Sequence, residues 1–130
     1  MLAGCCLGAG ALLPGSVPSA SAETALIGRV AWVSDDGSPT LRVYPTTEGR
    51  AIAGDFGKTA ADSDEAWNEV LALAPDADTP GMRAQFLCHW NFAEFAEPGK
   101  TSWDLEPWRP PVDPAAMLSA GCNPGGAERG

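Results

Sequence analysis

The stretch QFLCHWNFAEFAEPGKTSWDLEPWRP, residues 85–110, decides the fold of this chain. It holds the only histidine, His89, and three of the five tryptophans. Its first part predicts a helix that begins at Thr79-Pro80, a capping residue with a first-turn proline, and ends at Pro98-Gly99. Its last part, residues 102–106, alternates apolar and acidic side chains and therefore predicts a strand. With about 100° between successive residues, the apolar arc of the helix consists of Met82, Phe86, His89, Trp90 and Ala93.

Two strands and another helix are predicted before this stretch. Residues 26–33 and 40–44 are rich in β-branched and aromatic residues, and the turn chemistry of residues 35–39 joins them as a hairpin. A hairpin alone is marginal in water and needs a covering layer. The helix is expected to open at Asp62-Ser63, where Asp62 and Glu65 have capping-box spacing. Its apolar positions follow the helical period and are Trp67, Val70, Leu71 and Ala74.

The expected fold class is α+β. A small antiparallel sheet, made of the hairpin and the strand at residues 102–106, is covered by the two helices and tied by one disulfide. Residues 46–61 leave two alternatives open, a short helical turn after Thr46-Thr47 or an extra strand, with Ile52 and Phe56 as the apolar anchors. Asp113-Pro114 predicts a further short helix that ends near Leu118.

Residues 1–22 are predicted to be a signal peptide. An uncharged apolar run, too short to cross a bilayer, precedes Ala20-Ser21-Ala22, which fits a cleavage site before Glu23. The basic segment that usually precedes such a run is missing, which leaves a start upstream of Met1 open. A lipoprotein site at Cys5 is the alternative, but the apolar run follows this cysteine instead of preceding it. Residues 23–130 are then one exported domain, secreted or held at the cell envelope, with no transmembrane segment.

The charge of the chain limits its partners. All 8 basic and 17 acidic residues lie after residue 22, so residues 23–130 carry the whole net charge of −9. Nucleic acids and anionic membrane surfaces both require clustered Lys and Arg, so neither is expected as a partner. The sequence contains no H-E-x-x-H motif and no glycine-rich phosphate loop, and no metal or cofactor is expected.

Cys88 and Cys122 are predicted to form a disulfide. Cys5 and Cys6 leave with the signal peptide, and the two remaining cysteines reach a compartment that permits oxidation. Metal or redox chemistry is the alternative, but the two cysteines are not in C-x-x-C spacing. Closing a loop of about 35 residues stabilises a small domain by roughly 3–4 kcal/mol.

Several short motifs follow one another along nearly all of residues 23–130. They are Pro45-Thr46 with Gly49-Arg50, the Trp67 helix, Gln85-Phe86 with Cys88-His89, Lys100, Trp103-x-Leu105-Glu106-Pro107-Trp108-Arg109-Pro110, and Cys122-Asn123-Pro124. In these motifs the chain resembles a family of small exported domains of unknown function found mainly in actinobacteria, and the resemblance implies no activity.

His89, Asp104 and Glu106 are the candidate catalytic residues. A neutral imidazole can exchange protons near pH 7, and paired carboxylates can act on sugars or hold Ca²⁺. The apolar arc around His89 favours a structural role instead, with the ring hydrogen-bonded to Gln85 or to a carboxylate. Asp104 and Glu106 alternate along one strand, as solvated residues on an exposed face also do.

Trp108 and Arg109 are the candidate binding residues. The neighbouring prolines restrict the backbone, and Trp and Arg are common anchors of binding sites. In the alternative, Trp108 covers the core and Arg109 pairs with Glu106 or Asp113. The leading hypothesis is an exported, non-catalytic module that binds a glycan or a protein at or outside the cell envelope. The second hypothesis is a small envelope hydrolase that uses His89 with Asp104 or Glu106.

Overall fold

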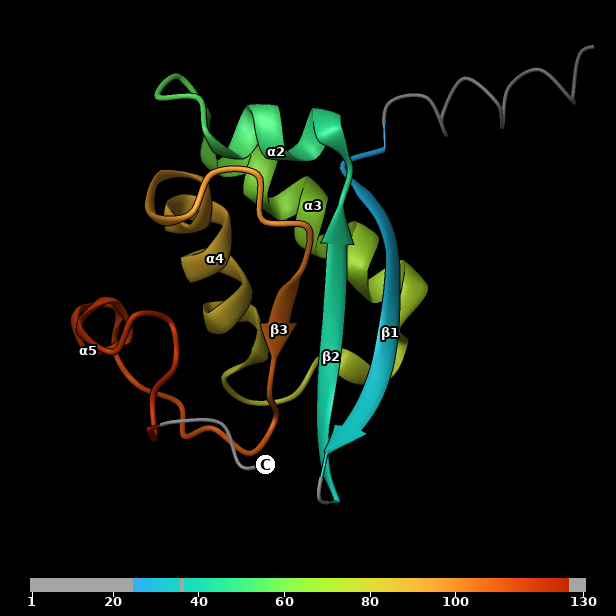
Figure 1. Cartoon of the computed structure of the whole chain (residues 1–130), viewed down its shortest axis with the longest axis vertical. Coiled ribbons are helices and arrows are strands. Elements are labelled where there is room, and N and C mark those ends of the chain that lie inside the picture. Colours follow the sequence, from blue (N-terminus) through green and yellow to red (C-terminus); the bar gives the residue numbers. More distant parts are fainter. Residues whose placement is uncertain (1–24, 36, 127–130) are drawn as a thin grey trace, which may run out of the picture.

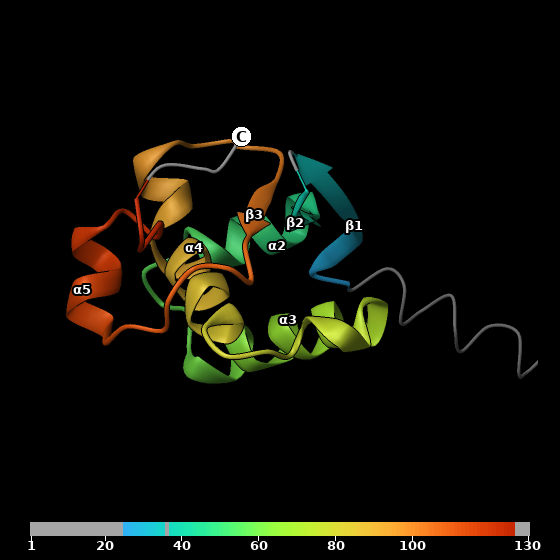
Figure 2. The ribbon, with the colours of Figure 1, turned by 90° about the horizontal axis from the view of Figure 1, so that it is seen from below.

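The computed structural model describes residues 25–35 and 37–126, and within them it has the predicted α+β architecture. Three antiparallel strands form a sheet in the order β1-β2-β3. Helices α3 and α4 cover one face of this sheet, and α5 lies beyond α4 on the side away from β1 (Figures 1 and 2). The predicted signal peptide lies outside the described residues. The elements are β1 (Ile27–Asp35), β2 (Ser38–Pro45), α2 (Thr47–Ala53), α3 (Ala60–Leu73), η1 (Pro75–Ala77), α4 (Met82–Ala96), β3 (Trp103–Leu105) and α5 (Pro114–Ser119).

The hairpin and the third strand form with the register that their apolar alternation demands. Leu41 of β2 pairs with Trp32 of β1 on one side and with Leu105 of β3 on the other. Because successive side chains of a strand point to opposite faces, Leu41 and Val43 share the inner face and are fully buried. The hairpin is therefore joined to the chain's later half by β3, as predicted.

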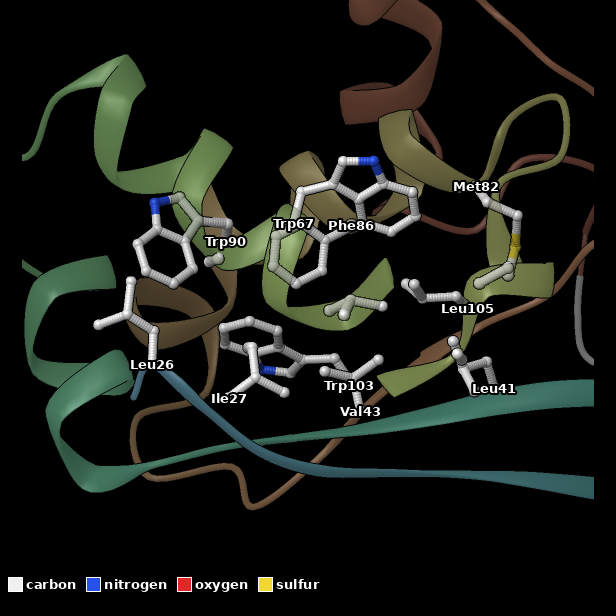
Figure 3. Close-up of a cluster of buried hydrophobic side chains, with 14 of the residues drawn as sticks. Leu26, Ile27, Leu41, Val43, Trp67, Met82, Phe86, Trp90, Trp103 and Leu105 are labelled. Carbon is white, nitrogen blue, oxygen red and sulfur yellow. The ribbon is translucent and has the colours of Figure 1, made fainter. Parts of the chain in front are cut away.

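The core lies between the sheet and the two covering helices (Figure 3). Trp103 of β3 meets Trp90 of α4 edge to face, with ring centroids 6.3 Å apart. Phe86 packs against both tryptophans, at centroid distances of 6.2 Å and 6.0 Å. Full burial of one such side chain stabilises the fold by roughly 1.5–3 kcal/mol. The stretch at residues 85–110 thus supplies the largest fully buried rings of the core.

Both covering helices begin at other residues than predicted. Helix α3 begins at Ala60, because Thr59 is its cap and donates its backbone N–H to Asp62 Oδ2 at 2.8 Å. Asp62 therefore stands in the first turn, where it forms a capping box with Thr59, and it is not the N-cap residue. Helix α4 begins only at Met82, since Gly81 has a φ of +87° and cannot continue a right-handed helix.

Within residues 46–61, Thr47–Ala53 form the short helix α2, the first of the two alternatives left open. Thr46 caps α2 by accepting the backbone N–H of Gly49 at 2.8 Å. Ile52 packs against the core, as expected, but Phe56 is 91% exposed and is not an anchor. The turn after α2 carries the Phe56 ring outward to meet Phe95 of α4, with centroids 5.1 Å apart.

Helix α5 forms where Asp113-Pro114 predicts it. Asp113 Oδ1 accepts the backbone N–H of Ala116 at 2.8 Å, which caps this helix of six residues. The chain then turns through Gly121 and Cys122, with φ values of +59° and +69°. A positive φ is strained for a cysteine, so α5 ends in a turn whose shape the disulfide helps to hold.

Candidate functional site

His89 lies on α4 at the edge of the core. It is 9% exposed, and its ring stacks on Trp103 with centroids 6.2 Å apart and an interplanar angle of 9°. Its Nε2 atom has no hydrogen-bond partner among the described residues. The Gln85 amide, one of the expected partners, instead makes two 2.9 Å hydrogen bonds with the backbone N–H and C=O of Glu106. That amide thereby extends the pairing of the short strand β3 onto helix α4.

The surroundings of His89 keep its imidazole neutral. Burial lowers the pKa of His89 to about 4 from its ordinary value of 6.5, and the positive charge of Lys100 adds to the effect. A hydrogen bond with the backbone of Asp104 and the charge of its carboxylate oppose this shift only in part. At neutral pH the ring is therefore a weak base, since an efficient general base has a pKa near the working pH.

The two candidate carboxylates do not lie side by side. Asp104 accepts two hydrogen bonds from Arg42 of β2, from Nε at 2.9 Å and from Nη2 at 3.2 Å. Glu106 is buried, and it accepts hydrogen bonds from Arg109 Nε at 2.8 Å and from Thr40 Oγ1 at 3.3 Å. The expectation of solvated residues holds in part for Asp104, whose side chain is 25% exposed, and fails for Glu106, and an arginine engages each carboxylate.

Arg109 is buried inside the protein, at 1% exposure. Its Nη2 lies 2.7 Å from Glu106 Oε1, and its Nη1 donates to the carbonyl oxygens of Pro124 at 2.9 Å and Gly126 at 2.6 Å. The expected presentation of Arg109 to an outside ligand is thus corrected to the alternative, an ion pair with Glu106. Trp108 is half-buried, with the guanidinium of Arg109 4.3 Å from its ring centroid. A binding role for Trp108 stays a prediction.

The disulfide forms as predicted and attaches α5 to α4. The Sγ atoms of Cys88 and Cys122 are 2.03 Å apart, and their Cα atoms 5.6 Å. Both cysteines pack with Met117 in a small apolar cluster separate from the main core. The disulfide and this cluster hold α5 on the side of α4 that faces away from the sheet.

A groove runs between α4 and α5, and it has two halves. The apolar half has a volume of about 220 Å³ and lies along the first half of α4. The polar half has a volume of about 350 Å³, lies along the second half of α4, and includes His89 and Lys100 in its lining. Phe92 and Leu118 line both halves, so we treat them as one site, the α4–α5 groove.

Metal-binding clusters and membrane-spanning helices are both absent from residues 25–35 and 37–126. No group of three His, Cys, Asp or Glu side chains there is arranged to hold a metal ion. No helix of the described part combines the length and the apolar character that spanning a bilayer requires.

The comparisons with known proteins show the family of the chain and name no activity. A family profile described as "Protein of unknown function (DUF2599)" matches residues 27–125. The chain belongs to the DUF2599 family. The resemblance to an actinobacterial domain of unknown function is thereby confirmed, because the similar proteins are mycobacterial.

Three relatives illustrate the membership of the DUF2599 family. The chain is 52% identical over 121 residues to the uncharacterized proteins Mb0487 of Mycobacterium bovis and Rv0477 of Mycobacterium tuberculosis, covering 93% of this chain and 78% of each relative. It is also 52% identical over 89 residues to the uncharacterized protein ML2452 of Mycobacterium leprae, covering 68% of this chain and 71% of that relative. No solved structure matches the chain.

Sequence reasoning missed the groove of this DUF2599 domain. Phe92 and Leu118 are large apolar side chains that remain 42% and 53% exposed. One signal was present in the sequence: Leu87 lies off the apolar arc of α4, among polar residues. An apolar residue in that position indicates that the helix has a second contact face, and in the structure Leu87 lines the apolar half of the groove.

Proposed function

We propose that this domain is a non-catalytic binding module that acts outside the cytoplasm, with the α4–α5 groove as its ligand site. The groove is the observation that carries the proposal. Small-ligand sites are typically concave and mostly apolar, with a few polar groups that fix the orientation of the ligand. Two exposed apolar side chains, Phe92 and Leu118, line both halves, and the polar groups gather at one end.

Binding is favoured over hydrolysis by the contacts of the candidate catalytic residues. A hydrolase of the expected kind needs His89 to be oriented by a carboxylate and to act as a base near pH 7. Asp104 is engaged by Arg42 and Glu106 by Arg109, while the low pKa of His89 makes it a weak base. The groove also favours a smaller and more apolar ligand than the glycan or protein that the sequence predicts.

The proposed location rests on the disulfide and on the sequence of residues 1–22. A disulfide persists in oxidising compartments, and the apolar run with its small-residue end has the pattern of a signal peptide. Mass spectrometry of the protein from the cell envelope and the medium is expected to find a chain that begins at Glu23. A chain that begins at Met1 and stays in the cytoplasm, or one with a lipid on Cys5, contradicts this part of the proposal.

The ligand site can be tested with prodan, a neutral dye whose emission shifts to the blue in apolar surroundings. We expect the shift with the native protein and a much smaller one with Leu118→Asn, because this change makes a shared wall of the groove polar. Leu73→Asn is the matched control, since Leu73 is similarly exposed, at 50%, on the distant helix α3. Equal dye binding by the two variants would place the apolar site elsewhere and overturn the proposal.

The hydrolase hypothesis has its own test in the same samples. We expect the wild type and His89→Gln to leave the spontaneous hydrolysis of 4-nitrophenyl acetate unchanged. A rate above background that is lost in His89→Gln supports catalysis and contradicts the binding module.

A further inference from the structure

The apolar half of the groove has the size and lining of a site for a hydrocarbon chain. Its volume is about 220 Å³, and Asn91 is the one side chain with a polar group in its lining. An apolar cavity of about 150 Å³ accepts benzene, so by proportion this half holds about nine carbon atoms. The lining residues are Ala84, Leu87, Cys88, Asn91, Phe92, Val112, Pro114, Met117 and Leu118.

The polar half offers a positive charge to the end of such a chain. Lys100 lines it, and its Nζ lies 3.7 Å from Glu97 Oε1, in a pair whose side chains are 43% and 68% exposed. An ion pair this long and this exposed contributes little, so the ammonium group can turn to a ligand anion. The imidazole of His89 lines the same half, but its Nε2 is buried from solvent, so Lys100 is the group that faces a ligand anion.

The two halves are adjacent, because they share part of their lining. Phe92 and Leu118 belong to both linings, and the disulfide lies at the junction, with Cys88 in the apolar half and Cys122 in the polar half. This covalent bond connects the two walls of the groove. Along α4 and just beyond it, the groove therefore has an apolar half, then two large apolar side chains, and then Lys100 beside Glu97.

We propose that the α4–α5 groove binds the anion of a medium-chain fatty acid, with the alkyl chain in the apolar half and the carboxylate beside Lys100. This inference rests on the proposed function and adds the class of the ligand. The positive charge of Lys100 favours an anionic head group, and the volume of the apolar half sets the length of the alkyl chain.

Titration calorimetry with octanoate, decanoate and dodecanoate below their micelle concentrations tests whether the alkyl chain of the ligand occupies the apolar half. Each added CH₂ group is expected to tighten binding about fourfold until the apolar half is full, and longer chains then gain nothing further. Leu118→Asn is expected to weaken the binding of decanoate at least about tenfold, while Leu73→Asn leaves its affinity unchanged.

The head group is tested by comparing decanoate with decanol and decyltrimethylammonium. Lys100→Gln is expected to weaken the binding of decanoate about threefold to fivefold and to leave the affinity for decanol unchanged. Lys58→Gln is the matched control, because Lys58 lies outside the groove, with its Nζ 5.2 Å from the ring centroid of Phe95. Decyltrimethylammonium is expected to bind more weakly than decanoate, because its charge repels Lys100.

Proton NMR of His89 supplies a readout that a purely structural role of Lys100 does not move. The charged groups acting on this ring are Lys100 and Arg109, which lower its pKa, and Asp104, which raises it; Glu97 shares the polar half. Bound decanoate neutralises Lys100 and brings a negative charge, so the pKa of His89 is expected to rise. Decanol is expected to leave it unchanged, and in Lys100→Gln the rise caused by decanoate is smaller.

The outcomes separate this inference from the proposed function. If prodan binds in the groove but decanoate does not, or binds no better than decyltrimethylammonium, the ligand class is wrong and the binding module stands. If neither prodan nor decanoate responds to Leu118→Asn, both proposals fall. A dimer in sedimentation velocity that Leu118→Asn dissociates and decanoate does not would assign the groove to a second copy of the chain and overturn the inference.

Discussion

Replacement of Arg109 by Met is expected to destabilise the domain more than any surface substitution. Arg109 and Glu106 are 1% and 3% exposed, and two nitrogens of the guanidinium lie within 2.8 Å of Glu106 Oε1. Removing one partner of a buried ion pair leaves an uncompensated charge and typically costs about 3–5 kcal/mol. A domain of this size is stable by roughly 5–15 kcal/mol, so a large part of its stability is expected to be lost.

The assay is urea unfolding of Arg109→Met, Glu106→Gln and the double variant. If each single change acts by leaving its partner unpaired, the double variant is expected to be more stable than the sum of the two losses by about 1–3 kcal/mol. Arg42→Met is the matched control, because Arg42 makes a similar pair with Asp104 near the surface, with side chains 39% and 25% exposed. Exposed ion pairs contribute about 0–1 kcal/mol to the free energy of unfolding, so Arg42→Met is expected to cost less than Arg109→Met.

One result would refute this reasoning. If Arg109→Met costs no more than Arg42→Met, the buried pair does not hold the C-terminal turn to the end of β3. The carbonyl oxygens of Pro124 and Gly126 offer a local check, because Arg109 Nη1 donates to both. Hydrogen exchange at residues 120–125 is therefore expected to accelerate in Arg109→Met and to stay unchanged in Arg42→Met.

Three further predictions concern His89 and the disulfide. His89→Ala is expected to cost roughly 1–4 kcal/mol in urea unfolding and His89→Gln less, because the ring fills space against Trp103; an Ala variant as stable as the wild type would favour the hydrolase hypothesis. The pKa of His89 is lowered to about 4 from 6.5, so as the pH falls the unfolded chain takes up this proton at a higher pH than the folded chain does. The free energy of unfolding is therefore expected to fall by about 2–4 kcal/mol between pH 6.5 and pH 4. An equal loss over this pH range in His89→Gln contradicts this. Reduction of Cys88–Cys122 is expected to lower the free energy of unfolding by about 3–4 kcal/mol, and an unchanged urea midpoint in reductant argues against it.

The sequence predicts those strands and helices in which one face is buried, because burial imposes a regular spacing on their apolar residues. The alternation in residues 40–44 and 102–106 and the helical spacing of Trp67, Val70 and Ala74 each place apolar side chains against the same core. Helix starts are less predictable, because several residues near Thr59 and Gly81 can end or cap a helix, and backbone geometry selects one of them. The exposure of Phe56 follows from the turn before it, which no apolar pattern specifies.

The fate of the charged residues could not be predicted from local patterns. Asp104 and Glu106 stand two residues apart, yet Asp104 meets Arg42 from a strand 62 residues away and Glu106 meets Arg109 three residues on. The first contact depends on the register between β2 and β3 and the second on the turn after β3. Burial of Arg109 further requires two carbonyl oxygens from a loop that the disulfide positions. Each contact is a consequence of tertiary structure.

The groove is explained by the way in which α5 is attached. A helix of six residues cannot bury enough apolar surface to hold itself on α4, and only Met117 of this helix is buried. The disulfide and the bonds from Arg109 to the loop after Cys122 replace that missing contact area. Because those tethers lie at the end of α5 and beyond it, and only Met117 of the helix is buried, the helix stays in place without filling all of the space beside α4. A segment held by its end over an unfilled apolar channel is suited to binding, since a ligand can complete the packing without displacing any part of the core.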